Sequence, residues 1–257
     1  MSLPSVPPLL EVRGLAKRFG GVVATDNLDL DLVAGEIHVV IGPNGAGKTT
    51  LIGQLAGEIR PDAGHIRFLG SDVTRLPPFA RARRGLVRSF QVTSIFRRFT
   101  TIENVVLAVQ AHAGHNFRLL RPAMRSPELL EPAWAALAKI GLERRADVPA
   151  AILSHGEQRQ LEIAMALATA PRVLLLDEPA AGMSLDETQR LVALLRELRQ
   201  EHAMLLVEHD MDAVFALADR ITVLVYGRVI ASGAPDAIRA DPEVRRAYLG
   251  DEAAIDG

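Results

Sequence analysis

The sequence contains no cysteine, few aromatic residues and no low-complexity tract. Without Cys, the chain can form neither a disulfide framework nor a thiolate metal site, which fits a reducing compartment. Aromatic residues make up only 4% of the chain, so it has few of the stacking platforms with which proteins bind single-stranded nucleic acid. These absences exclude a small disulfide-rich protein and argue against a nucleic-acid partner.

Long apolar runs and an excess of one charge are also missing. No apolar run reaches the ~18 residues that indicate a membrane span, and residues 1–8 have neither the basic start nor the apolar segment of a secretory signal. Lys and Arg number 29 against 31 Asp and Glu, so the charge gives no support to bulk binding of nucleic acid or anionic membrane. We therefore predict a cytoplasmic protein, which would need a partner's span to act at a membrane.

The 257 residues, 49% of them hydrophobic, are enough for one sizeable core, and no internal repeat is visible. The alternation over residues 28–32 predicts a half-exposed antiparallel strand, which follows a first strand at 9–12. Residues 72–150, rich in Arg and Pro, have a mostly helical pattern, and we place an inserted helical subdomain at about 92–160. From residue 157 onward, helices alternate with buried strands, which is typical of a parallel sheet covered on both faces. The other predicted elements are strand 37–41, helix 49–57, helices 103–113 and 132–140, helix 157–169, strand 173–176, helix 186–200, strand 204–207, helix 211–218, hairpin 221–231, and short helices 235–240 and 242–249.

The strongest single motif is the glycine-rich segment Gly-Pro-Asn-Gly-Ala-Gly-Lys-Thr-Thr at residues 42–50. It matches G-x-x-x-x-G-K-[ST], the phosphate loop (Walker A), and lies between an apolar strand and a helix as that loop requires. Its N–H groups would converge on phosphate oxygens, while Lys48 adds a positive charge and the Thr49 hydroxyl can ligate magnesium. The loop alone does not choose between a GTPase, a kinase and a motor. The predicted nucleotide-binding residues are Gly42, Pro43, Asn44, Gly45, Ala46, Gly47, Lys48, Thr49 and Thr50.

Asp177 and Glu178 follow the apolar residues 173–176. Ligands of parallel α/β sheets bind beyond the carboxyl ends of the strands. We therefore predict that Asp177 holds magnesium through water, and that Glu178 orients or deprotonates the water that attacks the γ-phosphate. A carboxylate pair after a strand is usually only a turn, but the phosphate loop upstream favours the catalytic interpretation.

Residues 153–162 read Leu-Ser-His-Gly-Glu-Gln-Arg-Gln-Leu-Glu. Ser154 and Gly156 stand at the start of a predicted helix, where free N–H groups and the helix dipole attract an anion. Taken alone, the segment also fits a plain capping box, in which Ser154 is the N-cap and Glu157 follows three residues on. Between the phosphate loop and the acidic strand end, it resembles the L-S-G-G-[EQ]-x-[QR] signature of ATP-binding-cassette (ABC) ATPases.

Three further residues match this family. Gln91 resembles the Q-loop glutamine that contacts magnesium, His209 resembles the switch histidine that contacts the γ-phosphate, and Phe19 stands where relatives place an aromatic residue against adenine. Two residues depart from the pattern: His155 replaces a glycine common in relatives, and Ser184 stands where the D-loop often has aspartate. The D-loop role therefore stays unassigned.

The resemblance implies a fold, cofactors and a mechanism. We expect one α/β domain over residues 9–250, a P-loop NTPase of the ABC cassette type with a parallel-sheet core, an N-terminal antiparallel β subdomain and the inserted helical subdomain. ATP and Mg²⁺ are the implied cofactors. Such cassettes act as pairs, homodimeric or with a paralogous cassette, so Ser154 and Gly156 would complete the site of the partner. The residues implied at the metal are Thr49, Gln91 and Asp177, and those implied in catalysis are Lys48, Glu178 and His209.

Several segments resemble one subfamily, the ATP-binding subunits of branched-chain amino-acid importers. The resemblance implies an ATPase that powers uptake through a separate membrane permease at the cytoplasmic face of the plasma membrane, with an extracytoplasmic solute-binding protein as an indirect partner. Related cassettes for urea, amides and lipopolysaccharide export share parts of these segments, and no residue shows the cargo. The segments are Phe19–Gly21, Arg88–Phe96, Leu174–Gly182, Val207–Met211 and Pro242–Gly250, the last within a tail at 235–250 typical of the group.

Other interpretations remain open at this stage. We expect the lobe around residues 92–126 to receive the permease's coupling helix, but the arginines nearby also fit an ordinary solvated face. A soluble ABC ATPase is less favoured because the chain has one cassette and no heptad tract, and a kinase or GTPase would leave the signature and His209 unexplained. A metal site at His112 and His115 is disfavoured, since no carboxylate is nearby. The arginines are Arg81, Arg83, Arg84, Arg88, Arg97 and Arg98.

Overall fold

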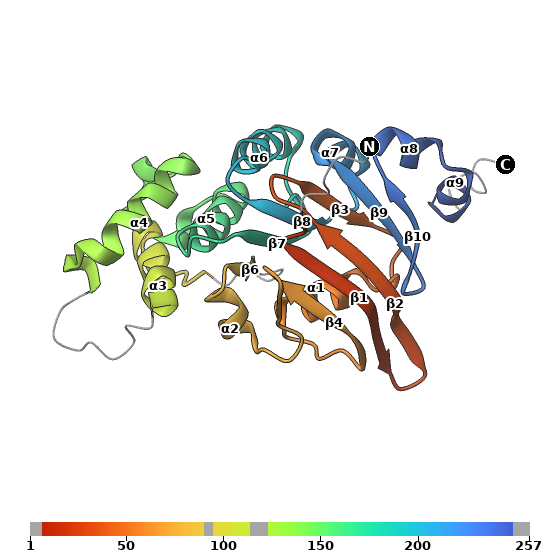
Figure 1. Cartoon of the computed structure of the whole chain (residues 1–257). Helices are drawn as coiled ribbons and strands as arrows, with labels where there is room; N and C mark the ends of the chain where they lie inside the picture. The colour runs from red at the N-terminus through yellow and green to blue at the C-terminus, as the bar shows by residue number, and fades with distance from the viewer. Residues whose placement is uncertain (1–6, 90–94, 114–122, 249–257) are drawn as a thin grey trace.

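The structure, a computed structural model, describes residues 7–89, 95–113 and 123–248 (Figure 1). In this part of the chain the strands form two sheets, one six-stranded and one four-stranded. The helices α3 and α4 lie together at one side of the molecule, away from the sheets. This arrangement confirms the predicted parallel core and N-terminal antiparallel sheet.

The larger sheet has the strand order β10-β9-β3-β8-β7-β6. All neighbouring pairs are parallel except the antiparallel hairpin of β9 and β10. Every residue of β3, β7 and β8 is buried, as expected for strands that are covered on both faces. The strands are β3 (Ile37–Ile41), β6 (Leu86–Arg88), β7 (Val173–Asp177), β8 (Ala203–Val207), β9 (Arg220–Val225) and β10 (Arg228–Gly233).

The smaller sheet, β2-β1-β4-β5, is antiparallel. Leu28, Leu30 and Leu32 are buried while the residues between them are more exposed, so the predicted half-buried strand is confirmed. The first strand runs well past its predicted end at residue 12. The sequence pattern missed the second half of the strand because register shifts, which begin between Val12 and Leu15, interrupt the alternation of side chains. The strands are β1 (Leu10–Phe19), β2 (Val22–Leu32), β4 (Ala63–Phe68) and β5 (Ser71–Asp72).

The described helices are mostly short. None is long and apolar enough to cross a membrane among the residues that the structure covers. The predicted strand 37–41 and helix 235–240 are confirmed to the residue. The helices are α1 (Lys48–Ala56), α2 (Pro78–Ala82), α3 (Thr101–Ala113), α4 (Pro127–Lys139), α5 (His155–Leu167), α6 (Leu185–Leu198), α7 (Met211–Leu217), α8 (Pro235–Ala240) and α9 (Pro242–Tyr248), with 3-10 turns η1 (Ala123–Arg125), η2 (Glu143–Arg145) and η3 (Ala150–Ile152).

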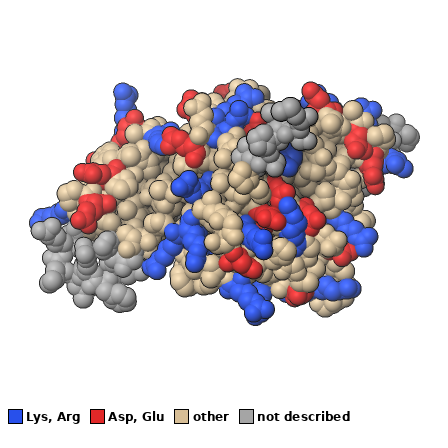
Figure 2. Space-filling view, viewed as in Figure 1, with Lys and Arg blue, Asp and Glu red and all other residues tan. Residues whose placement is uncertain are grey.

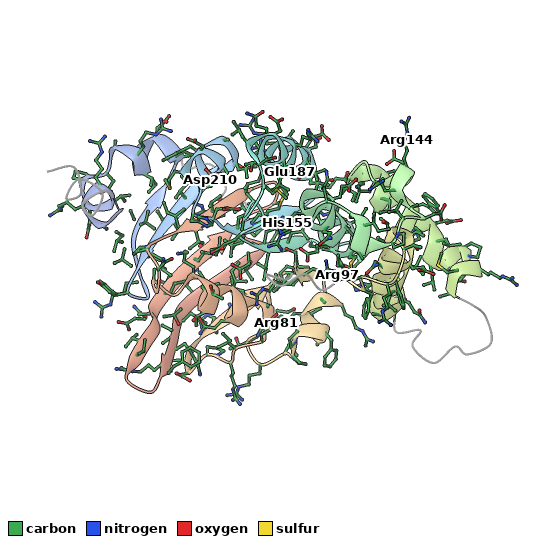
Figure 3. All side chains as sticks on the ribbon, turned by 180° about the vertical axis from the view of Figure 1, so that it is seen from behind. Arg81, Arg97, Arg144, His155, Glu187 and Asp210 are labelled. Atoms are coloured by element: carbon green, nitrogen blue, oxygen red, sulfur yellow. The ribbon has the colours of Figure 1, made fainter. Side chains whose placement is uncertain are left out.

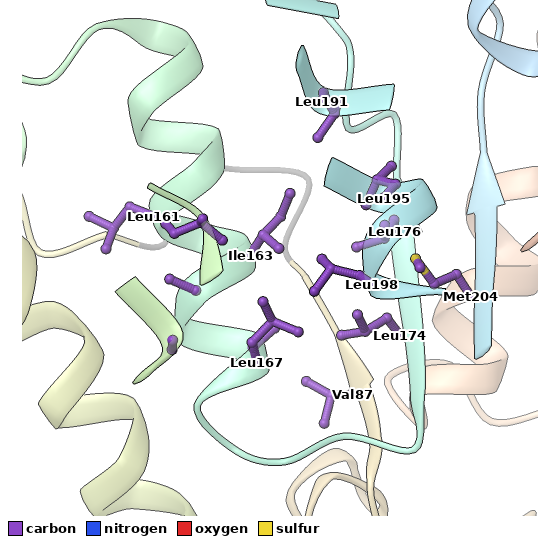
Figure 4. Packing of buried hydrophobic residues seen from close by; sticks show 14 of the residues in the cluster. Val87, Leu161, Ile163, Leu167, Leu174, Leu176, Leu191, Leu195, Leu198 and Met204 are labelled. Atoms are coloured by element: carbon purple, nitrogen blue, oxygen red, sulfur yellow. The ribbon is translucent and has the colours of Figure 1, made fainter. Parts of the chain in front are cut away.

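Two hydrophobic clusters lie on opposite faces of the larger sheet. In β7, Leu174 and Leu176 belong to one cluster, and Val173 and Leu175 belong to the other, because successive side chains of a strand point to opposite faces. The first cluster packs leucines of α5 and α6 against the sheet (Figure 4). The second encloses α1 between the larger and the smaller sheet. The helix that follows the phosphate loop is therefore held by both sheets.

The start of the helical region differs from its prediction. Residues 78–88 form α2 and β6, and β6 pairs in parallel with β7, so this stretch belongs with the larger sheet. The strand was missed because three residues are too few to show a periodic pattern. Beyond it, α3, α4 and α5 pack on one another. The boundaries of the inserted subdomain, about 92–160, stay a proposal.

Arg81 has the largest fully buried side chain of the described residues, so its interpretation as part of a solvated face was wrong. Its guanidinium donates to the carbonyl oxygens of Gln54 and Leu55, at 2.8 and 2.7 Å, at the C-terminal end of α1. This end carries unpaired carbonyls and negative partial charge, which stabilise a cation. Burial lowers the pKa of Arg81 to about 10, so the side chain stays charged at neutral pH.

Surface charges of both signs are intermixed on the face seen in Figure 2. Some of them form ion pairs, such as Arg13 with Asp31 at 2.6 Å and Lys17 with Asp62 at 2.8 Å. Partly exposed pairs of this kind contribute only about 0–1 kcal/mol each. The stability of the fold therefore depends mainly on the two buried clusters.

His38 in β3 is a buried histidine within a chain of hydrogen bonds. Its Nδ1 lies 3.1 Å from the carbonyl oxygen of Asp31 and therefore donates, so Nε2 accepts from the Thr222 hydroxyl at 2.7 Å. Thr222 in turn pairs with Ser232 at 2.7 Å. Burial, together with the nearby charge of Arg220, lowers the pKa of His38 to about 4.

We expect this histidine to make the fold less stable in mild acid. Between pH 6.5 and about 4 the unfolded chain binds a proton at His38 that the folded chain does not, so stability falls as pH falls through this window. The loss should reach about 3 kcal/mol at pH 4. Urea unfolding of the wild type and of His38→Gln between pH 7 and pH 4.5 checks this. The gap in unfolding free energy between the two should narrow as pH falls, and a constant gap would contradict the prediction.

Candidate functional site

The phosphate loop connects β3 to α1 and passes between β9 and β2. A Cβ atom at Gly42 would lie 2.1 Å from the carbonyl oxygen of Leu224, and one at Gly47 would lie 2.0 Å from that of Ala24. Gly47 also has a φ of +104° at the N-cap of α1. Both contacts are with backbone atoms, so only glycine fits at these two positions.

Lys48 lies inside the curl of the loop. Its ammonium group donates to the carbonyl oxygens of Gly42 at 2.5 Å and Pro43 at 3.1 Å. Burial lowers the pKa of Lys48, while the carboxylates of Glu178 and Asp177 favour its charged form. The loop therefore holds a cation next to the two strand-end carboxylates, as its motif predicts.

Asp177 ends β7 with its side chain fully buried. Its Oδ2 accepts from Arg88 Nη2 at 2.7 Å, and Arg88 also pairs with Glu58. Its Oδ1 has no hydrogen-bond partner in the described structure. Burial raises the pKa of Asp177, although the charge of Arg88 opposes this.

The donor set around Asp177 fits a hydrated magnesium ion. Mg²⁺ keeps several of its waters and uses one or two carboxylates together with phosphate oxygens, and the orphaned Oδ1 is an acceptor that such a water can satisfy. No group of three or more His, Cys, Asp or Glu in the described residues could hold a metal alone. The phosphate oxygens of a bound nucleotide would supply further ligands to such an ion.

Glu178 lies on a turn with unusual backbone geometry. Its φ of +48° is in the left-handed region, which is uncommon for a residue other than glycine and costs about 1 kcal/mol or more. Its N–H donates to the carbonyl oxygen of Val207 at 2.9 Å. Its carboxylate lies 3.9 Å from Nδ1 of the exposed His209. The two predicted catalytic residues at the strand ends are thus adjacent.

An open cavity of about 310 Å³ brings most of the predicted nucleotide-binding residues together. It is bordered by residues 44–50 of the phosphate loop, by Glu178 and by Phe19 at the end of β1. Phe19 is 50% exposed, and the Lys17 ammonium lies 5.3 Å from its ring centroid. An exposed ring at the edge of a phosphate site can stack on a nucleotide base.

Ser154 and Gly156 do not border this cavity; they lie at the start of α5 in a separate cleft beside Met183 and Glu187. The capping box is present, since the Ser154 hydroxyl accepts from the N–H of Glu157 at 3.2 Å. The Glu187 carboxylate packs against Gly156, where an added Cβ atom would lie 2.5 Å from its Oε1. Figure 3 shows Glu187 on α6 near His155 at the start of α5. The position at which this helix would attract an anion therefore holds a carboxylate of the same chain.

Gln91 lies outside the described residues, so its place at the metal stays a prediction; His115 is outside them too. Three residues that contact the site were missed. Arg88 was grouped with solvated arginines, although its place at the end of a strand beside β7 could have indicated that it meets Asp177. Glu187 could have been found from the S-x-x-E pattern of Ser184 and Glu187, which forms a second capping box. The bond of Glu208 with Ala180 has no such signal, because it joins elements that are distant in the chain.

We expect Gly47→Ala to reduce ATP affinity at least about tenfold, because the new Cβ would displace the loop from Ala24. Gly70→Ala is the matched control, since Gly70 has a φ of +75° but no atom within 4 Å of an added Cβ. This control should lose about 1–2 kcal/mol of stability from the left-handed backbone and bind ATP normally. Calorimetric titration and thermal unfolding measure both quantities. Equal ATP affinity in the two variants would contradict the close-contact argument.

Comparison with known proteins agrees with this geometry. The family model described as "ABC transporter" matches residues 25–181, and the model described as "Branched-chain amino acid ATP-binding cassette transporter" matches residues 228–254. The chain is 45% identical to the high-affinity branched-chain amino acid transport ATP-binding protein LivG of Escherichia coli and 42% identical to BraF of Pseudomonas aeruginosa. Each alignment spans 251 residues and covers 95% of this chain and 98% of the relative.

A solved structure shows the same fold. The crystal structure of a nucleotide-free ATP-binding cassette from an ABC transporter is similar with a TM-score of 0.84 at 27% identity, covering 94% of this chain and 99% of that one. The family model spans more than half of the chain, and its residues include the phosphate loop, the helix start at Ser154 and the strand-end carboxylates. The protein therefore belongs to the ABC transporter family, as one of its ATP-binding and ATP-hydrolysing cassettes.

Proposed function

We propose that this cassette powers the import of branched-chain amino acids through a separate permease, at the cytoplasmic face of the plasma membrane. The observation that carries the proposal is the match of residues 228–254 to the branched-chain amino acid cassette model. The similarity to LivG and BraF along almost the whole chain supports it. A solute-binding protein outside the membrane would deliver the cargo to the permease.

The described geometry supports the proposed role of each site residue that it covers, while Gln91, which lies outside the described residues, is assigned by resemblance alone. The backbone of residues 42–50 and Lys48 would bind the phosphates, while Phe19 stacks on adenine. Thr49 and Asp177, the latter through water, would hold Mg²⁺ together with Gln91. Glu178 would activate the attacking water, with His209 beside it at 3.9 Å.

We infer that the active unit is a pair of cassettes. Ser154 and Gly156 do not border the cavity of their own phosphate loop, so they are available to a nucleotide bound by a second copy or a paralogous cassette. On closure, the γ-phosphate of a nucleotide bound by the other cassette would approach this helix start, where N–H groups and the helix dipole attract an anion.

Glu178→Gln tests this pairing, because it should retain ATP binding and block hydrolysis, so that ATP holds the closed pair together. Light scattering with Mg-ATP should then report a dimer, whereas Lys48→Ala, which loses a phosphate contact, should stay monomeric. A monomeric Glu178→Gln with intact ATP binding would count against the homodimer. The experiment would then be repeated with the paralogous cassette.

A second cavity supports the position of the permease contact. It measures about 430 Å³ and lies where α2 and β6 meet α3. Phe79, Ala82 and Ala108 form an apolar lining, with Phe79 65% exposed, and Arg83 stands at its edge. A groove between the sheet and the helical lobe could pass a movement of the lobe to a permease helix, which is the role proposed for this site.

Uptake in the native host tests the cargo. Deletion of the gene should abolish uptake of labelled leucine, and the wild type but not Glu178→Gln should restore it. Urea and a polar amino acid serve as controls. If leucine uptake were unchanged and urea uptake were lost, the ATPase role would stand and the cargo would be different. Unchanged uptake of all three, in a host without a redundant importer, would overturn the import proposal.

A further inference from the structure

Glu208 is a buried carboxylate between the two candidate catalytic residues at the strand ends. It follows β8 directly and is only 1% exposed. Its Oε1 accepts from the N–H of Ala180 at 2.9 Å, and its Oε2 accepts from the N–H of His209 at 3.2 Å. Both partners are backbone amides, and they belong to two different loops at the same edge of the larger sheet.

This position is unfavourable for a carboxylate. Burial raises the pKa of Glu208, and the nearby charge of Glu178 acts in the same direction. Burying a charge costs free energy unless the group is well bonded, and an apolar side chain of similar volume often stabilises such a place better. Fold stability therefore does not explain why this position holds a glutamate. The hydrogen bonds of its carboxylate to Ala180 and His209 do explain it.

The hydrogen bonds of Glu208 hold the turn that carries Glu178. The turn has left-handed backbone at Glu178, with a φ of +48°. It is attached before Pro179 by the bond from Glu178 N–H to the carbonyl of Val207, at 2.9 Å, and after Pro179 by the bond from Ala180 N–H to Glu208. Strained backbone persists only where its surroundings fix it. Without Glu208, only one of these two attachments across the sheet edge would remain.

We propose that Glu208 is a positioning residue for ATP hydrolysis. Its two hydrogen bonds fix the position of the turn that carries Glu178 relative to the backbone of His209. The inference rests on the proposed catalytic roles of Glu178 and His209. Glu208 itself does not border the nucleotide cavity, so it acts through these two residues. Its loss should therefore change the rate of hydrolysis and leave ATP binding intact.

The test compares Glu208→Gln with Glu36→Gln in the purified full chain. Glu36 is the control, because it is also buried and also accepts a backbone N–H, that of Val33 at 2.9 Å, but lies at the opposite end of β3 from the phosphate loop. It also forms an ion pair with Arg220, so this substitution should disturb the fold at least as much as Glu208→Gln does. Glutamine keeps the shape of Glu208 but retains only one acceptor oxygen for two N–H donors. We expect kcat for ATP to fall about tenfold or more in Glu208→Gln, with KM and the Kd of a non-hydrolysable ATP analogue within about twofold of wild type.

Hydrogen exchange gives a second readout that needs no turnover. The amides of Ala180 and His209 should exchange faster in Glu208→Gln and stay protected in Glu36→Gln. Unchanged exchange at both amides, kcat within about twofold of wild type, or an equal loss of kcat in Glu36→Gln would overturn the proposal. Glu178→Gln is assayed beside them. If it hydrolyses ATP normally, the role of Glu178 fails; if it is inactive while Glu208→Gln is not, only the present proposal fails.

Discussion

The parallel register of β3, β8 and β7 is the constraint on which the nucleotide site depends. Val207 pairs with Val40 on one side and with Asp177 on the other, so the three strands end at the same level. The phosphate loop, the turn of Glu178 and the segment of His209 therefore leave the sheet side by side. A shift of one residue in any of these strands would turn its buried side chains to the opposite face and separate the loops.

The same edge concentrates charged groups, and Asp177, Arg88 and Glu208 among them are largely buried. The positive charges of Arg88 and Lys48 offset the carboxylates of Asp177 and Glu178. Glu208 accepts hydrogen bonds from two backbone amides instead. Charges interact more strongly where water is excluded, so each group orients its neighbours as well as stabilising them. A bound nucleotide with its proposed metal ion would enter an arrangement whose donors and acceptors are already placed.

The sequence predicted the parts of the site that short motifs encode. The phosphate loop and the carboxylates after β7 could be identified because each lies within a few consecutive residues at a strand end. Phe19 was located by resemblance, while the full length of β1 was hidden by its register shifts. The contacts of Arg88 with Asp177 and of Glu208 with Ala180 were missed because each joins segments that are distant in the chain. The subdomain boundaries and Gln91 stay predictions.

The strand order also has a consequence for the synthesis of the chain. The phosphate loop follows β3, which is made early, but both neighbours of β3 in the sheet, β8 and β9, begin only at Ala203 and Arg220. Pairings between such distant segments form slowly because a long loop must close first. Since Gly42 and Gly47 are seated against β9 and β2, the loop can take its final shape only after the ribosome has released most of the chain. Nucleotide binding is therefore among the last properties that the newly made protein acquires.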